Sequence, residues 1–195
     1  ILRLCIGVCD AMAYIHKSGY THRDITISNI FVKGGRAKLG DFGLARRVKE
    51  NVITVAGACI PVCHSIYAPP ELKRKEYPVP YTFSCDVYCF GVAVWEMLML
   101  RKWAREDTQR SRQDVLNDLA EFPSYFANIV SRCWHEEGAS RPNFDELHVE
   151  FVDIYTDECY TNRSRSSGLS SDTPTNQTDV FVEELDATDS LLRSL

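Results

Sequence analysis

His22-Arg23-Asp24-Ile25-Thr26-Ile27-Ser28-Asn29 opens the stretch of sequence that decides the fold, and Asp41-Phe42-Gly43 closes it. Between them lie two short apolar runs, 30–32 and 37–39, separated by Gly34-Gly35, which is a strong signal for a β-hairpin. Folding this hairpin brings Asn29, just before its first strand, close to Asp41, just after its second. Carboxylate and amide oxygens suit a hard cation that bridges phosphates, so the sequence predicts a Mg²⁺ site here.

The pattern H-R-D-x-x-x-x-N followed by D-F-G resembles the catalytic loop and metal-binding motif of protein kinases. The resemblance implies that Asp24 accepts and orients a substrate hydroxyl, while Asn29 and Asp41 hold Mg²⁺ against the β- and γ-phosphates of ATP. It also implies that Arg23 contacts a phosphorylated residue. His22, Phe42 and Gly43 belong to the same motifs as structural residues, with Gly43 allowing the backbone to turn.

Residues 43–71 show no periodicity and end in Tyr67-Ala68-Pro69-Pro70-Glu71, which resembles the end of a kinase activation segment with Pro69 where alanine is usual. We expect a switch loop that orders on phosphorylation, with an upstream kinase as a partner. The available phosphate acceptors are Thr54, Ser65 and Tyr67, of which Thr54 is favoured.

Two helices frame these motifs. Residues 1–18 repeat apolar positions at three- and four-residue steps and end at Gly19, and residues 84–97 are apolar nearly all round, as in a helix at the centre of a domain. By resemblance, Asp86 accepts backbone N–H groups of the catalytic loop. The alternative is that Asp86 is an ordinary helix N-cap, and both roles are compatible.

Cys133-Trp134 followed by Arg141-Pro142 resembles the tyrosine kinase and tyrosine kinase-like groups. In these groups the arginine matching Arg141 forms a buried ion pair with the acid matching Glu71. The alternative is a surface arginine and an unrelated glutamate. The cysteine–tryptophan pair favours tyrosine as acceptor, whereas Tyr67, where tyrosine kinases usually have tryptophan, slightly favours serine or threonine.

The expected fold is mainly α with a small β-hairpin, a kinase-like C-terminal lobe (α+β) without its N-terminal lobe. Further helices are expected over 114–120, 122–133 and the amphipathic stretch to 154, while the charged residues 101–112 are expected to be exposed. The resemblance covers residues 1–157. Residues 158–195 are expected to form a disordered acidic tail rich in Ser and Thr.

The composition of the chain limits the classes of function that it can have. The chain has 195 residues, 45% of them hydrophobic, enough for one domain with an ordinary core. A net charge of −5 argues against nonspecific nucleic-acid binding, and no apolar run predicts membrane insertion. Without a recognisable signal peptide, a cytoplasmic protein is expected. Three cysteine pairs spaced by four, Cys5/Cys9, Cys59/Cys63 and Cys85/Cys89, are interpreted as reduced thiols, with metal binding as the alternative.

Two departures from the kinase pattern lead to a second hypothesis. Kinases usually place a cation two or four residues after the catalytic aspartate, where this chain has the neutral Thr26 and Ser28, and His64 is a candidate substitute. No Gly-rich loop or phosphate-binding lysine precedes residue 1, and Lys38 lies on the strand before Asp41, so we expect little ATP affinity from this chain alone. The first hypothesis is an ATP-dependent protein kinase acting on protein substrates. The second is a pseudokinase or scaffold that binds a kinase or substrate without catalysis.

Overall fold

The structure, a computed structural model, describes residues 1–48, 52–53, 67–73 and 79–166. These residues are mainly helical, with short antiparallel strand pairs, so the predicted fold class is confirmed. The α-helices are α1 (Leu2–Lys17), α2 (Pro70–Lys73), α3 (Phe83–Met99), α4 (Arg112–Asn117), α5 (Ser124–Cys133) and α6 (Phe144–Ser166). The short 3-10 helices are η1 (Ile27–Asn29), η4 (Asp107–Gln109), η5 (Asp118–Glu121) and η6 (Gly138–Ser140). The strand pairs are β1 (Tyr20–Thr21) with β4 (Arg46–Arg47), β2 (Ile30–Lys33) with β3 (Arg36–Leu39), and β5 (Val52–Ile53) with β6 (Val79–Pro80).

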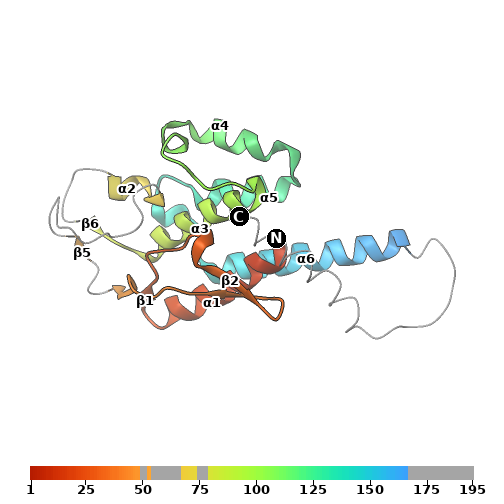
Figure 1. The fold of residues 1–195 in the computed structure, drawn as a ribbon, viewed down its shortest axis with the longest axis horizontal. Helices are drawn as coiled ribbons and strands as arrows, with labels where there is room; N and C mark the ends of the chain where they lie inside the picture. Colours follow the sequence, from red (N-terminus) through yellow and green to blue (C-terminus); the bar gives the residue numbers. More distant parts are fainter. Residues whose placement is uncertain (49–51, 54–66, 74–78, 167–195) are drawn as a thin grey trace.

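Helix α3 lies at the centre of the domain (Figure 1). Of its 17 residues, 13 are buried, as its apolar composition on every face predicts. Helix α5 packs closely against it at Gly91, where an added Cβ would lie 2.8 Å from Cβ of Cys133. The small residue therefore permits the close approach of the two helices.

Helix α1 runs alongside α6, and the β2–β3 hairpin packs on α1 through β3 (Figure 1). The buried face of α1 carries Cys5, Val8, Cys9 and Met12, at the three- and four-residue steps that predicted the helix. Each end of α1 lies one residue inside the predicted range 1–18. The helix ends at Lys17, and the short strand β1 connects it to the catalytic motif that begins at His22.

The predicted β-hairpin is confirmed. Ile30 pairs with Leu39 and Lys33 with Arg36, and the connecting Gly34 and Gly35 have φ angles of 56° and 68°. Two successive positive φ angles are those of a two-residue turn that matches the twist of its strands, and glycine adopts them without steric cost.

One boundary predicted from composition differs from the element observed in the structure. Helix α6 continues to Ser166, so the predicted domain end at residue 157 falls inside a helix; no glycine or proline interrupts the chain between Asn143 and Gly168. The remainder of the predicted tail, residues 167–195, lies outside the described residues. Helix α5 confirms the helix predicted over 122–133 and starts after Pro123.

The predicted exposure of residues 101–112 is also wrong at two positions. Trp103 is buried and packs edge-on against Trp95, with ring centroids 4.9 Å apart. Asp107 is buried as well, because Arg101 and Arg110 bind its carboxylate. A charged residue can thus be buried where partners of opposite charge bind it.

The described cysteines are free thiols, and five of these six are buried. Burial raises the pKa of Cys5, Cys85 and Cys133 to about 12, so these side chains remain protonated at neutral pH and are poor metal ligands. Over residues 1–48, 67–73 and 79–166, no cluster of histidine, cysteine and acidic residues has the geometry of a metal site. Cys59 and Cys63 lie outside the described residues.

Among the described helices, none is both long enough and apolar enough to cross a lipid bilayer.

Candidate active site

The loop that follows β1 is anchored to the core by one carboxylate. Oδ2 of Asp86, in the first turn of α3, accepts the backbone N–H of His22 at 2.9 Å, and Oδ1 accepts that of Arg23 at 2.9 Å. Tyr81 donates its hydroxyl to Oδ1, and His16 lies 2.9 Å from Oδ2. The predicted contact of Asp86 with the catalytic loop is confirmed, and Thr82, not Asp86, is the N-cap residue of α3.

This anchoring holds Arg23 in a strained conformation. Its φ of 71° lies in the left-handed region, which costs a non-glycine residue on the order of 1–3 kcal/mol. The side chain is buried, with the guanidinium 5.1 Å from the centre of the Tyr81 ring. The two hydrogen bonds to Asp86 offset this strain and turn the loop sharply between His22 and Asp24.

His22 links the loop to the far end of the hairpin. Its Nε2 lies 3.1 Å from the carbonyl oxygen of Gly40, and its Nδ1 accepts the backbone N–H of Asp24 at 3.3 Å. Burial lowers the pKa of His22, although the carboxylates of Asp86, Asp24 and Asp41 oppose this effect. A neutral ring with its proton on Nε2 satisfies both contacts. The ring also packs edge-to-face on Phe42, with centroids 4.9 Å apart.

Asp24 and Asn29 are in direct contact. The amide nitrogen of Asn29 donates to the backbone oxygen of Asp24 at 2.9 Å and to its carboxylate Oδ2 at 2.8 Å. Asn29 is the last residue of the short helix η1, which separates the loop from β2. Because the amide nitrogen faces Asp24, the amide oxygen of Asn29 is directed elsewhere.

Asp41 lies beside this pair through the register of the hairpin. Gly40 donates its N–H to the backbone oxygen of Asn29 at 2.9 Å, so Asp41 is the next residue after the direct partner of Asn29. Asp41 has a φ of 58°, and its Oδ1 accepts the N–H of Gly43 at 3.2 Å. The hairpin thus brings the two ends of the motif together, as the sequence predicts, and leaves the Asp41 side chain exposed.

Comparison with known proteins gives the family. Residues 1–151 match the model for "Protein tyrosine and serine/threonine kinase". The chain belongs to this protein kinase family.

Its relatives include proteins named as tyrosine kinases and a protein named as a putative serine/threonine kinase. The chain is 32% identical over 165 residues to "Tyrosine-protein kinase TXK" of Mus musculus, and 30% identical over 158 residues to the protein of the same name from Homo sapiens. It is 28% identical over 157 residues to "Putative serine/threonine-protein kinase/receptor R826" of Acanthamoeba polyphaga mimivirus. These matches cover 79%, 75% and 76% of this chain, but only 30%, 28% and 9% of the three relatives.

The predicted ion pair of this kinase chain is present. Nη1 and Nη2 of Arg141 bind Oε1 and Oε2 of Glu71 at 2.7 and 2.8 Å, and the Arg141 side chain is fully buried. Glu71 is less buried than expected, since a quarter of its side chain is exposed. Burial raises the pKa of Glu71, but the hydrogen bonds and charge of Arg141 outweigh burial and lower it overall. The pair joins α2, at the end of the predicted activation segment, to the loop before α6.

The surroundings of Tyr67 in this structure do not favour its predicted role as a phosphate acceptor. Tyr67 is buried, and its hydroxyl donates to Oε1 of Glu96 at 2.6 Å. Burial and the nearby Glu96 carboxylate both raise the pKa of Tyr67. The hydroxyl is thus a buried hydrogen-bond donor in this structure. The other two candidates, Thr54 and Ser65, lie outside the described residues, as does His64.

Sequence reasoning missed Glu96, a buried carboxylate in the apolar helix α3. Its Oε1 accepts from Tyr67 and from the backbone N–H of Trp103 at 2.7 Å. Burial raises the pKa of Glu96, although these hydrogen bonds oppose the rise. A single acidic residue inside an apolar run signals a buried acceptor, but its partners are distant in the sequence and only the fold identifies them.

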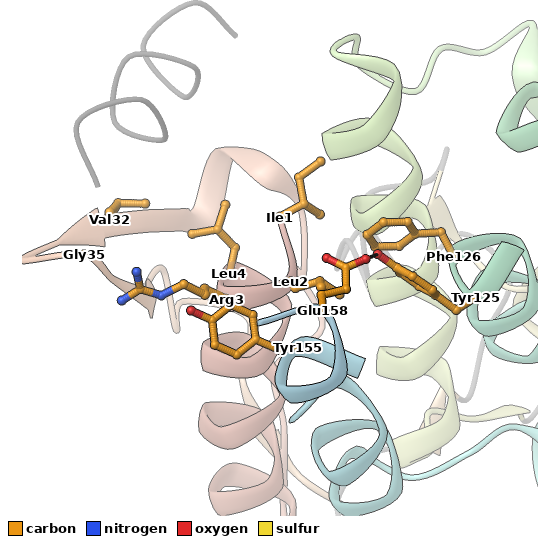
Figure 2. A pocket seen from close by; sticks show the side chains of 10 residues that line it. All are labelled: Ile1, Leu2, Arg3, Leu4, Val32, Gly35, Tyr125, Phe126, Tyr155 and Glu158. Atoms are coloured by element: carbon orange, nitrogen blue, oxygen red, sulfur yellow. Dashed lines mark hydrogen bonds between the residues drawn. The ribbon is translucent and has the colours of Figure 1, made fainter. Parts of the chain in front are cut away.

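A cavity of about 380 Å³ lies at the other end of α1 from the catalytic loop (Figure 2). Its lining residues come from the start of α1, the hairpin, α5 and α6: Ile1, Leu2, Arg3, Leu4, Val32, Gly35, Tyr125, Phe126, Tyr155 and Glu158. None of the residues predicted to be catalytic lines this cavity, so it is separate from the candidate active site.

Proposed function

We propose that the protein transfers the γ-phosphoryl group of ATP to a hydroxyl group of a protein substrate. The observation that carries this proposal is the contact between Asn29 and Asp24 at one end of the hairpin, with Asp41 next to the strand partner of Asn29. This arrangement supports the proposal, because phosphoryl transfer requires a proton acceptor and oxygen ligands for Mg²⁺ close to one another.

The residues fit Mg²⁺, because the Asn29 amide and the Asp41 carboxylate are hard oxygen donors and the Asp41 side chain is exposed. When bound, the ion would neutralise charge on the phosphates of ATP. Asp24 would orient the acceptor hydroxyl and take its proton. The hydroxyl oxygen forms a bond to the γ-phosphorus, the bond to the β–γ bridging oxygen breaks, and ADP leaves with the electron pair.

The second candidate function is a scaffold that binds a kinase or substrate without catalysis. The neutral Thr26 and Ser28 favour it, because neither of the positions two and four residues after Asp24 then carries a cation. For Arg23, we propose a role in binding a phosphorylated residue of the activation segment, with Thr54 as the first candidate and an upstream kinase as its source.

The test uses the protein in its natural full length, with Mg-ATP and a mixture of peptides bearing serine, threonine or tyrosine. We expect Asp24→Asn and Asp41→Asn to lower kcat by on the order of 10²–10⁴-fold. Asp10→Asn, the same change at an exposed site on α1, is the matched control and should stay within about twofold of the parent. A parent protein no more active than the Asp24→Asn variant would favour the scaffold. Phosphoamino-acid analysis of the product gives the acceptor class.

A further inference from the structure

The loop between α3 and α4 contacts the catalytic loop through Lys102. The ammonium Nζ of Lys102 lies 3.4 Å from Oγ of Ser28, a residue 74 positions earlier in the sequence. Ser28 directly precedes Asn29, whose amide binds the carboxylate of Asp24. A positive charge thus reaches the catalytic loop from another part of the chain.

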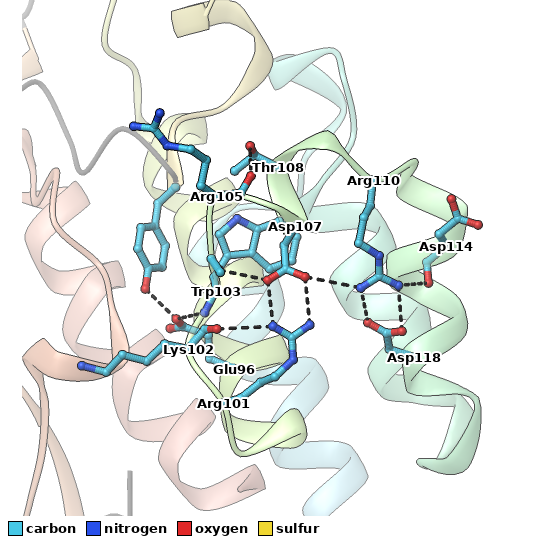
Figure 3. Close-up of polar contacts among 12 residues, drawn as sticks. Glu96, Arg101, Lys102, Trp103, Arg105, Asp107, Thr108, Arg110, Asp114 and Asp118 are labelled. Carbon is cyan, nitrogen blue, oxygen red and sulfur yellow. Dashed lines mark hydrogen bonds and ion pairs between the residues drawn. The ribbon is translucent and has the colours of Figure 1, made fainter.

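The backbone on both sides of Lys102 is fixed (Figure 3). Arg101 binds both carboxylate oxygens of Asp107 at 2.8 Å, and its guanidinium lies 4.3 Å from the centre of the Trp95 ring. Trp103 is buried and donates its N–H to Glu96 at 2.7 Å.

Asp107 is itself held from two further directions. Its Oδ2 accepts the N–H of Ala104 at 2.9 Å, and Arg110, which also binds Asp118 through both nitrogens, lies 3.4 Å from its Oδ1. Lys102 is therefore an exposed side chain on an ordered backbone, so its ammonium has a limited region to occupy.

Phosphoryl transfer at this site requires a positive charge near the catalytic loop. Asp24 and Asp41 are both carboxylates, and a phosphoryl group in transfer spreads negative charge over its oxygens. The loop itself offers the buried hydroxyl of Thr26 and the exposed hydroxyl of Ser28, and neither carries charge. A lysine is a compact charge on a flexible stem and can approach a phosphate oxygen from Ser28 by rotation of its own side chain.

We propose that Lys102 supplies the positive charge that faces the transferring phosphoryl group, in place of a cation at position 26 or 28 of the catalytic loop. This inference rests on the proposed phosphoryl transfer and assigns a catalytic residue that lies outside the kinase motifs. It predicts an effect mainly on kcat, because the charge matters most when the phosphoryl group is between donor and acceptor.

The experiment uses the full-length protein with Mg-ATP and a peptide substrate. We expect Lys102→Met to lower kcat by at least about tenfold, with less than about a threefold change in the KM for ATP, while Lys102→Arg retains most of the activity. Arg105→Met removes an exposed cation three residues away and should leave kcat within about twofold of the parent. Melting temperatures of both methionine variants should match the parent, since both side chains are exposed.

A rescue experiment distinguishes loss of the Lys102 charge from a change in the local structure. In the Lys102→Met background, Ser28→Arg places a guanidinium where the ammonium had been, and we expect it to raise kcat at least about fivefold. The proposal is overturned if Lys102→Met is as active as Arg105→Met, or if Ser28→Arg gives no recovery. A parent protein as inactive as Asp24→Asn would instead refute the proposed function itself, and the role of Lys102 with it.

Discussion

Replacing Arg141 by alanine tests whether the ion pair with Glu71 holds the domain together. The guanidinium donates to both oxygens of Glu71 and to the backbone oxygens of His135, Ser84 and Glu136. Alanine removes all of these donors at once and leaves a carboxylate and three carbonyl groups without them.

The expected loss of stability in Arg141→Ala follows from the burial of this ion pair. Removing one partner of a buried ion pair lowers the free energy of unfolding by about 3–5 kcal/mol. Each carbonyl group left without a hydrogen-bond donor lowers it by up to about 1 kcal/mol more when water cannot reach that group. Because a quarter of the Glu71 side chain is exposed, water can hydrate its carboxylate in the variant, and this reduces the loss of stability. We therefore expect Arg141→Ala to lower the free energy of unfolding by about 3–5 kcal/mol, equivalent to a fall in melting temperature of about 6–20 °C.

The assay is urea unfolding of the full-length protein, followed by tryptophan fluorescence, with thermal melting as a second measurement. Arg132→Ala is the matched control, because Arg132 also pairs with a glutamate, Glu150, but both side chains are at least one-third exposed. We expect that control to lose less than about 1 kcal/mol. Equal midpoints for the Arg141 and Arg132 variants would refute the reasoning, since burial is what distinguishes the two pairs.

Two further predictions concern the buried carboxylates. Tyr67→Phe removes the hydroxyl that binds Glu96 and should cost about 1–3 kcal/mol of stability by urea unfolding, whereas Tyr14→Phe, at a side chain that is 75% exposed, should cost nothing measurable. If the two variants unfold alike, Glu96 does not depend on that hydroxyl. Hydrogen bonds from Arg101 lower the pKa of Asp107 from 3.8 to about 2, so its carboxylate contributes about 2 kcal/mol above pH 4 that is lost as the pH falls from about 4 to 2. Asp107→Asn should therefore be less stable than the parent at pH 7 and pH 5 alike, with the difference shrinking at pH 3; a difference that persists at pH 3 would contradict this assignment.

The sequence by itself determined the elements whose signals are local. The two glycines at 34 and 35 specify the hairpin turn because their backbone conformation is open to few other residues. The apolar positions of α1 and the fully apolar α3 specify their own burial. The motif spacing also predicts that Asn29 lies close to Asp41, and in the structure the backbone of Asn29 binds Gly40, the residue before Asp41.

Only the tertiary structure decided which distant groups meet. Nothing near Lys102 in the sequence indicates that its ammonium reaches Ser28, and nothing near Tyr67 shows that its hydroxyl is enclosed against Glu96. The charged residues 101–112 are predicted from sequence to form an exposed loop, yet Asp107 is buried. A buried carboxylate is stable only where groups of opposite charge bind it, as Arg101 does here. Patterns of three to four residues report on one element and its neighbours, whereas the pairing of charges across the domain depends on how the packed helices bring their ends together.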